Sequence, residues 1–263
     1  MHTSRRRAGA TAAVLTAAAA TAFSVSSGAA NAASVPVPLH RPMAITHSAA
    51  AHPGRKATVY TSNWAGYVAD SGTYNQVLAD WTQPTLTCPS GATTSSAYWV
   101  GIDGYSSTTI EQTGVEADCD SGTASYYAWF DSDPADPLET SFGGTVKPGD
   151  QLVAQVSASG DVFTYLVEDK TQGWTVTQPV TASGAAKSSA EVILEAPSDD
   201  NGNVLPLADF GTVDFTGTEA DSTALSSLST EPLQLDMSTE AGVAEATSST
   251  LSGSAFSVTW DSE

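Results

Sequence analysis

The stretch from Ala97 to Gly114 carries the residues of this chain best suited to chemistry. Its alternation predicts a strand over 97–103 with Trp99 and Asp103 on one face, then a turn and a return strand over 108–113 that carries Gln112. The Trp99 indole and the Asp103 carboxylate form a small polar site with an apolar wall. The Gln112 amide joins them if the two strands pair so that it lies on the same face. A solvated hairpin face is the competing interpretation.

A second run of interest is SAEVILEA at 189–196. Alternation predicts a strand that sends its small and apolar residues to a core and presents Glu191 and Glu195 on the opposite face. Paired carboxyl groups on one face can serve acid–base chemistry. The simpler interpretation is a half-exposed antiparallel strand that shows acidic side chains to water.

The composition of residues 59–263 excludes several kinds of site. All four histidines lie before residue 59, so this part lacks the imidazole of serine and cysteine hydrolase triads and of the common zinc sites. Three lysines against 29 carboxyl groups give it a formal charge of −26, which leaves no basic surface for nucleic acid. Repulsion among so many carboxylates falls as they protonate near a pKa of about 4, which indicates adaptation to acid. A halophile-like surface is the alternative, although only 14% of the residues are charged.

The first residues have the organisation of an export signal. Three arginines at 5–7 precede an alanine-rich apolar run, and Ala30-Asn31-Ala32 is a small-x-small cleavage site. The run is too short to span a membrane comfortably, and no later stretch is long enough. We expect a signal peptide at 1–32, a proline-rich pro-segment or linker at 33–58, and a secreted, extracellular domain at 59–263 that is not held at a membrane. The adjacent arginines leave the export route open.

Cys88 and Cys119 are the only cysteines. In an exported chain an even pair predicts a disulfide, which here would close a loop around the 97–114 hairpin.

Short β-type runs separated by turn residues account for most of residues 59–263. We expect strands over 64–69, 74–81, 97–103, 108–113, 125–130, 143–146, 151–158, 162–169, 173–180, 189–196, 212–216 and 254–260. Runs at this spacing, with no helical period, predict a single all-β domain, a sandwich or a barrel. The weakly patterned stretch 217–253 is expected to form edge strands or surface loops.

Eight segments of this domain form an ordered set: SNWAGY at 62–67, WTQP at 81–84, YWVGIDG at 98–104, EQTG at 111–114, YYAWF at 126–130, VKPGD at 146–150, SAEVILEAP at 189–197 and LADFGTVDF at 207–215. Together they resemble the glutamic peptidases known as eqolisins, which are secreted acid endopeptidases. The resemblance implies an antiparallel, lectin-like β-sandwich of two sheets, one of them bent into a substrate groove. It further implies that the chain acts on protein or peptide substrates, and we expect no metal or other cofactor. The export signal suggests a bacterial member of the family, and a monomer is the default for a secreted hydrolase.

The resemblance also assigns site residues. The family's catalytic glutamine and glutamate correspond to Gln112 and Glu191, and Trp99 and Asp103 correspond to supporting residues. Trp64 and Trp129 would line the substrate cleft. Glu191 would act as general base and then as general acid, while the Gln112 amide would hold the water and the oxyanion. Glu195 is the second choice for the acid.

One segment departs from the family pattern. Members continue Tyr-Ala-Trp with Tyr-Glu-Trp and a following Tyr-Pro, whereas this chain continues Phe130-Asp131-Ser132-Asp133-Pro134. Because the acid is shorter and aromatic residues are lost, the side-chain preference of the groove is expected to differ.

Two other functions compete with peptide hydrolysis. A carbohydrate-binding β-sandwich would stack its tryptophans on sugar rings and use its acids for hydroxyl groups or Ca²⁺. A glycosidase would use Glu191 and Glu195 as paired carboxyl groups, an alternative that expects them about 7 Å apart.

Overall fold

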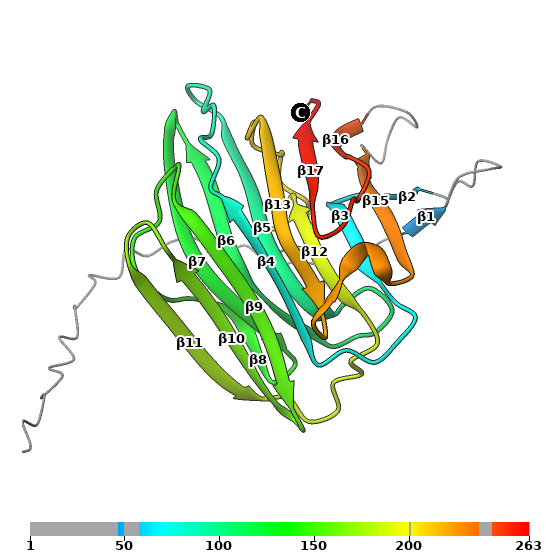
Figure 1. Ribbon diagram of the computed structural model, residues 1–263. Helices are drawn as coiled ribbons and strands as arrows, with labels where there is room; N and C mark the ends of the chain where they lie inside the picture. The colour runs from blue at the N-terminus through cyan, green and yellow to red at the C-terminus, as the bar shows by residue number, and fades with distance from the viewer. Residues whose placement is uncertain (1–46, 50–57, 200, 237–243, 263) are drawn as a thin grey trace, which may run out of the picture. The chain divides into compact units, whose positions relative to one another are not determined.

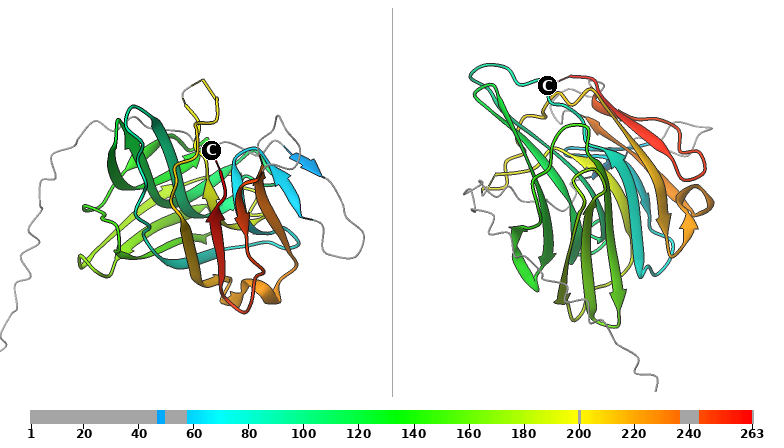
Figure 2. Two further views of the ribbon diagram at one scale, coloured as in Figure 1. Left: turned by 90° about the horizontal axis from the view of Figure 1, so that it is seen from above. Right: turned by 60° about the vertical axis from the view of Figure 1, so that its left-hand side comes forward.

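Two layers of β-strands make up this protein, as the computed structural model shows (Figure 1). The structure describes residues 47–49, 58–199, 201–236 and 244–262, all within a unit that spans 36–263. The expected signal peptide at 1–32, and the expected pro-segment except for 47–49 and residue 58, lie outside the described residues. The predicted antiparallel β-sandwich is confirmed. Figure 2 shows its layers from two further directions.

Sheet A carries the stretches singled out from the sequence. Its strands, in spatial order, are β8 (Asp136–Ser141), β7 (Thr123–Asp133), β6 (Ile110–Asp120), β5 (Thr93–Asp103), β12 (Ala190–Glu195), β3 (Trp64–Ala69) and β15 (Thr230–Asp236). All these pairings are antiparallel, so β12 lies between two strands that are distant from it in sequence.

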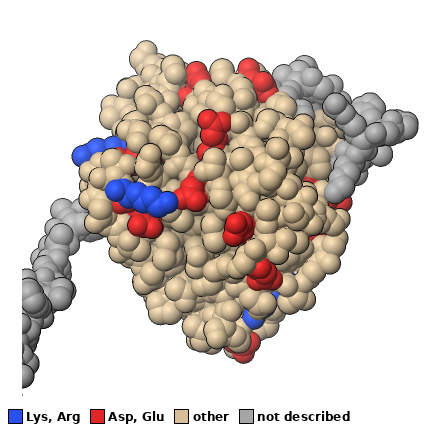
Figure 3. Space-filling view, viewed as in Figure 1, with Lys and Arg blue, Asp and Glu red and all other residues tan. Residues whose placement is uncertain are grey.

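Sheet B forms the second layer. Its strands, in spatial order, are β11 (Trp174–Thr181), β10 (Val162–Asp169), β9 (Gln151–Ser159), β4 (Gln76–Thr82), β13 (Thr212–Ala220), β17 (Phe256–Trp260) and β16 (Ala244–Ser248). Because β16 also pairs with β15, the two layers are joined along one edge. Figure 3 shows the outer face of sheet B, where scattered acidic side chains outnumber basic ones.

Four short elements complete the fold. β2 (Val59–Thr61) runs parallel to β15, β1 (His47–Ala49) pairs antiparallel with β2, β14 (Thr223–Ala224) pairs with the end of β13, and a 3-10 turn follows at Leu225–Ser227. The weakly patterned stretch 217–253 therefore supplies edge strands and loops, as expected for its described part.

The core lies between the layers and follows the period of the strands. On β4 and β9 buried and less buried residues alternate, as expected for strands with one face in the core. The central strands of sheet A differ, because nearly every residue of β5, β6 and β12 is buried. Sheet A thus has a second buried face, where a separate apolar cluster contains Trp64, Trp99, Trp129 and Ile193. Glu191 and Glu195 do not form the half-exposed strand of the simpler interpretation.

Most expected strands are confirmed, often with shifted ends, and one is wrong. Residues 143–146 form a bend and a loop, while the strand of that region is β8, which begins at Asp136. At Gly143 and Gly144 an added Cβ would lie within 2.9 Å of the Trp174 ring. The two glycines therefore serve the packing of an indole rather than strand pairing.

Candidate active site

Glu191 and Gln112 lie in one row across sheet A, on either side of the same glycine. The register pairs Glu191 of β12 with Gly101 of β5, and Gly101 with Gln112 of β6. Residues paired in this way project to the same face, and neighbouring strands are about 4.8 Å apart. The two side chains therefore rise from one surface, with a single strand between them.

Because Gly101 has no side chain, it leaves room above β5 in which the Gln112 and Glu191 side chains can approach each other. A Cβ at this position would lie 2.8 Å from Cγ of Gln112 and 2.8 Å from Cζ3 of Trp99, closer than side chains tolerate. The Gln112 side chain thus leans over β5, toward the strand that carries Glu191. The glycine of the Trp-Val-Gly-Ile-Asp-Gly motif is accounted for by this close approach.

The polar atoms of both side chains are buried and available. Glu191 and Gln112 are 0% exposed, and neither their carboxylate oxygens nor their amide atoms have a hydrogen-bond partner among the described residues. Buried polar groups are nearly always hydrogen-bonded, so two such side chains in one row are unusual in a structural role. They are suited to holding a polar ligand between them.

The electrostatic surroundings favour the neutral form of Glu191. Its pKa is raised well above the usual 4.5, chiefly by burial. The nearby Ser189 hydroxyl opposes the shift, and the negative charges of Asp103 and Glu111 add to it. Perturbed carboxyl groups of this kind cluster at functional sites.

Three buried tryptophans form the apolar wall next to this row. Trp64 and Trp99 contact each other edge to face, with ring centroids 4.8 Å apart, and Trp129 belongs to the same cluster. Trp99 pairs with Gly114 of β6, where an added Cβ would lie 2.1 Å from a backbone oxygen, so only glycine fits beside the indole. All three predicted tryptophans lie together on the face of the candidate pair.

Glu195 does not lie where the glycosidase alternative expects it, about 7 Å from Glu191. Its carboxylate accepts hydrogen bonds from Nε1 of Trp99 at 2.9 Å and from Nδ2 of Asn63 at 3.2 Å. It lies four residues from Glu191 along β12, about 13 Å at the rise of a strand, and not near 7 Å. This separation exceeds the carboxyl spacing of glycosidases, which is about 5–9.5 Å, so Glu195 orients an indole rather than forming the second acid of a pair.

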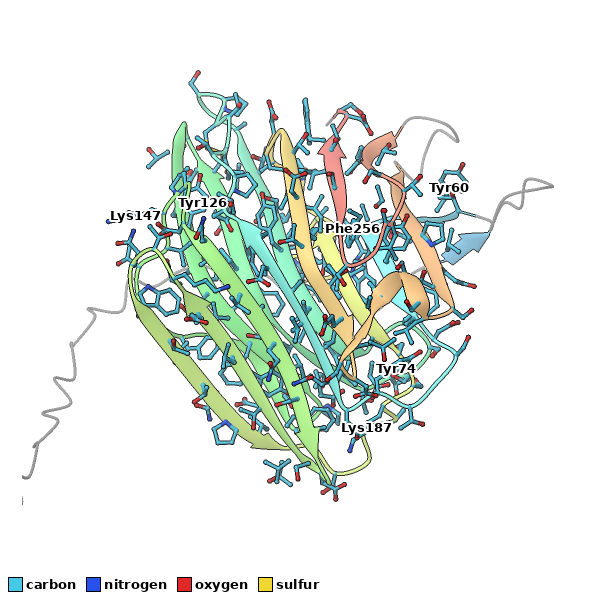
Figure 4. The ribbon with its side chains drawn as sticks, viewed as in Figure 1. Tyr60, Tyr74, Tyr126, Lys147, Lys187 and Phe256 are labelled. Carbon is cyan, nitrogen blue, oxygen red and sulfur yellow. A yellow bond between two sulfur atoms is a disulfide. The ribbon has the colours of Figure 1, made fainter. Side chains whose placement is uncertain are left out.

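Asp103 also differs from the expectation, because the alternation ends at this residue. Its backbone is in the left-handed region, with φ of 70°. The carboxylate accepts hydrogen bonds from the backbone N–H groups of Lys187 at 2.6 Å and Ser188 at 2.8 Å, and from the hydroxyls of Ser188 and Thr109. Asp103 therefore fastens the segment that leads into β12. Figure 4 labels Lys187 near Tyr74, whose N–H donates to the Lys187 carbonyl.

Two acids near the row were not recognised as site residues from the sequence. Asp131 of β7 pairs with Gln112 and extends the row by one strand, and Glu111 lies directly before Gln112 with its side chain on the other face. Knowledge of the strand register would have identified Asp131. No local pattern marks Glu111, because an acid on the core face contradicts the alternation.

The remaining expectations about the domain concern its cross-links and ions. The predicted disulfide between Cys88 and Cys119 is confirmed. Within the described part of the chain, no group of three or more His, Cys, Asp or Glu side chains is arranged to hold a metal ion. The same part contains no helix that is long and apolar enough to cross a membrane.

Comparison with known proteins bears on the same residues. The signature of the peptidase A4 family matches residues 62–260. The chain belongs to this family.

Several members of the peptidase A4 family support the assignment. Aspergillopepsin-2 of Aspergillus niger is 30% identical over 226 residues, which cover 76% of this chain and 78% of that protein. Scytalido-glutamic peptidase, solved with a transition-state analogue inhibitor, superposes with a TM-score of 0.64 at 26% identity over 76% of this chain and 98% of its own. The eqolisin SCP-B, solved with the tripeptide Ala-Ile-His, gives a TM-score of 0.62 at 25% identity over the same shares of the two chains.

As a peptidase A4 member, the chain is a glutamic-type peptidase, a hydrolase whose substrates are proteins or peptides. The match includes every residue considered above for the site, from Trp64 to Glu195. Which of these side chains act in catalysis stays a prediction.

Proposed function

We propose that this protein is a secreted acid endopeptidase in which Glu191 transfers protons and Gln112 holds the water and the oxyanion. One observation carries the proposal. A carboxyl group and an amide, both fully buried and without a partner among the described residues, flank a glycine in one row of sheet A. A peptide carbonyl above Gly101 would lie within reach of both side chains.

In the first step, ionised Glu191 takes a proton from a water molecule whose oxygen attacks the peptide carbonyl carbon. The carbonyl oxygen becomes an oxyanion, to which Nε2 of Gln112 donates a hydrogen bond. Since an amide does not titrate, Gln112 supplies this bond at any pH. One such donor is worth about 10²–10³ in kcat.

In the second step, Glu191 returns its proton to the peptide nitrogen. The carbon–nitrogen bond breaks, the amine leaves, and the new carboxyl group carries the oxygen from water. Glu191 is ionised again, so a single carboxyl group performs both proton transfers. The domain beyond residue 58 contains no histidine that could share this task.

The surroundings of Glu191 define a pH dependence for this mechanism. The base must be ionised, and burial raises its pKa well above 4.5. The acid limb of kcat/KM should therefore lie above pH 4.5, because the free enzyme's catalytic group determines that limb.

The test is cleavage of denatured casein or haemoglobin across the acid range, with pepstatin and EDTA present to suppress aspartic and metallopeptidases. Glu191→Gln should abolish turnover, and Gln112→Ala should lower kcat by about 10²–10³ while the fold persists. Glu168→Gln on β10 of sheet B is the matched control and should leave activity unchanged. Near-normal turnover by purified Glu191→Gln would end the proposed mechanism.

We also propose that residues 1–32 direct export and that 33–58 is a pro-segment. Part of the latter, at His47–Ala49, pairs with β2, whose Val59 packs in the same cluster as Trp64 and Trp99. This segment is basic, whereas the domain is acidic, so it can lie against the domain at neutral pH and leave it in acid. Mass spectrometry of the protein secreted at neutral and acid pH tests both cleavages, the one that removes the signal peptide and the one that removes the pro-segment. A mature protein that starts before residue 33 would refute the signal peptide. A domain expressed without 33–58 that is equally inactive at neutral pH would remove support for a blocking role.

A further inference from the structure

The row of Gln112, Gly101 and Glu191 continues beyond Glu191 toward one edge of sheet A. Glu191 pairs with Val68 of β3, and Val68 pairs with Glu231 of β15, the next strand in that direction (Figure 1). Residues paired in this way project to one face, so Glu231 faces the same surface as the candidate pair. At about 4.8 Å between strands, Glu231 lies about 14 Å from Gly101 along the row.

The turn between β5 and β6 folds back onto this row. Its Gly104 has a φ of 99°, and a Cβ added there would lie 3.4 Å from Nε2 of Gln112 and 3.5 Å from Cη2 of Trp64. The turn therefore lies next to the amide of the candidate pair and next to an indole of the apolar wall. The N–H of Gly104 donates to the Ser107 hydroxyl at 3.2 Å, which closes the turn.

Tyr105, the next residue of this turn, reaches from there to the far end of the row. Its hydroxyl donates a hydrogen bond to Oε2 of Glu231 at 2.5 Å. Its ring packs against the apolar cluster that contains Trp64 and Val68. Because Val68 stands between Glu191 and Glu231 in the row, the ring lies on the β3 side of the candidate carboxyl. Tyr105 and Glu231 are each only partly buried, so part of this pair is accessible to a ligand.

The pair of Tyr105 and Glu231 closes the row on one side of the space above Gly101. A substrate carbonyl above Gly101 would lie two strands, about 10 Å, from Val68, next to which the Tyr105 ring stands. The surfaces in between are apolar, since Val68 and the tryptophans belong to one buried cluster. The Glu231 carboxylate is already engaged by the phenol, so a substrate meets the ring rather than a charge. The space suits one apolar side chain of small or medium size.

We propose that Tyr105 is a specificity-determining residue. Held by Glu231, its ring forms the far wall of the subsite on the Glu191 side of the scissile bond. This wall favours small or medium apolar side chains at one position of the substrate over large aromatic ones. The assignment rests on the proposed function, because it takes the scissile carbonyl to lie above Gly101.

The first experiment compares the wild type with Tyr105→Ala on one mixed peptide library at acid pH, with the cleaved bonds identified by mass spectrometry. The variant lacks the wall. At one substrate position, kcat/KM for peptides with Phe or Trp should therefore rise about tenfold or more relative to peptides with Ala or Val. This ranking is a ratio between substrates of the same enzyme, so a lower folded fraction of the variant does not change it.

Two further variants provide a test of the anchor and a control. Glu231→Leu removes the acceptor of the Tyr105 hydroxyl, and its ranking should shift in the same direction by a smaller factor. In the Tyr105→Ala background, Glu231→Leu should change the ranking by less than about twofold, because no ring is left to hold. Tyr126→Ala is the matched control and should keep the wild-type ranking. Tyr126 of β7 is also partly buried and accepts a hydrogen bond from Leu86, but it packs on the core between the sheets (Figure 4).

Peptide binding provides a readout that needs no turnover. In a Glu191→Gln background, dissociation constants are measured for short peptides that carry Trp or Ala at each position in turn. At one position the affinity for Trp relative to Ala should rise about tenfold when Tyr105→Ala is added.

Equal rankings for the wild type and Tyr105→Ala in both assays would overturn the subsite. Shifts spread over positions on both sides of the scissile bond would overturn it as well, because they indicate a general loosening of the cleft. The proposed function can fail separately. If Glu191→Gln still cleaves while Tyr105→Ala changes the ranking at one position, the catalytic assignment is wrong and the subsite stands. If none of the proteins cleaves any peptide, the binding series alone decides the subsite.

Discussion

Replacing Gly101 with alanine tests whether Gln112 and Glu191 converge over β5. The new Cβ would lie 2.8 Å from Cγ of Gln112, 2.8 Å from Cζ3 of Trp99 and 3.4 Å from the backbone oxygen of Glu111. Real Cβ contacts are rarely below 3.4 Å, so the glutamine must move by about half an ångström or more. Neither Trp99, which packs on Trp64, nor the β6 backbone can yield as easily.

The expected effect on activity exceeds the effect on stability. Overpacking a buried site costs about 1–3 kcal/mol, which a folded domain of this size can tolerate. A catalytic group misplaced by about 1 Å can lose about 10² in rate. We therefore expect Gly101→Ala to remain folded in urea titrations and to lose about 10–10² in kcat, with KM less affected.

A double-mutant cycle with Gln112→Ala identifies the cause of the loss. If Gly101→Ala acts by displacing Gln112, it should cost little more in a protein that already lacks this side chain. Full additivity of the two losses would show that alanine acts elsewhere. A Gly101→Ala enzyme with kcat within twofold of the wild type would refute the convergence of the two side chains.

Three further predictions concern stability. Trp99→Phe should cost about 1.5–3 kcal/mol more than Trp64→Phe in urea unfolding, because only the Trp99 indole donates to the Glu195 carboxylate; equal losses would contradict that role. Replacing Cys88 and Cys119 by serine should cost about 3–4 kcal/mol, as estimated for a closed loop of 31 residues, and a loss below about 1 kcal/mol would refute the estimate. The free energy of unfolding should fall as pH rises from about 4.5 toward 9, because the pKa of Glu111 is raised by folding, and urea midpoints that rise over this range would contradict the assignment.

Local alternation was enough to predict the strands that have one face in the core. β10 (Val162–Asp169) matches its predicted range, since apolar and polar residues alternate along it and the turn before it is marked by Ser159-Gly160-Asp161. β5 and β6 were expected to be shorter than they are. Their outer parts, such as Thr93–Ser96, contain polar residues that are buried by tertiary contacts, which no local pattern signals.

The motifs identified the two residues of the candidate pair but not the structural role of the neighbouring Asp103. The row joins β12, which carries Glu191, to the β5–β6 hairpin, which is distant from it in sequence, so the place of Glu191 beside Gly101 depended on resemblance to a family rather than on spacing. Asp103 was expected beside Trp99, but its left-handed backbone turns the carboxylate toward the Lys187–Ser188 segment. A sequence shows that a turn begins at such a residue, not which distant N–H groups its side chain will meet.

The surroundings of Glu191 relate the charge of the whole domain to its chemistry. A carboxyl that must both accept and return a proton needs a raised pKa, and burial among other acids provides it. The same arrangement has a cost for folding. For Glu111 a rise from 4.5 to about 9 amounts to at most about 6 kcal/mol of stability, present below pH 4.5 and lost by pH 9. This loss is comparable to the total stability of a typical domain, about 5–15 kcal/mol. At a pH below its raised pKa, Glu111 stays neutral and this penalty is avoided, whereas Glu191 must be ionised to act as the base. Stability therefore limits the working range from the alkaline side, and catalysis limits it from the acid side.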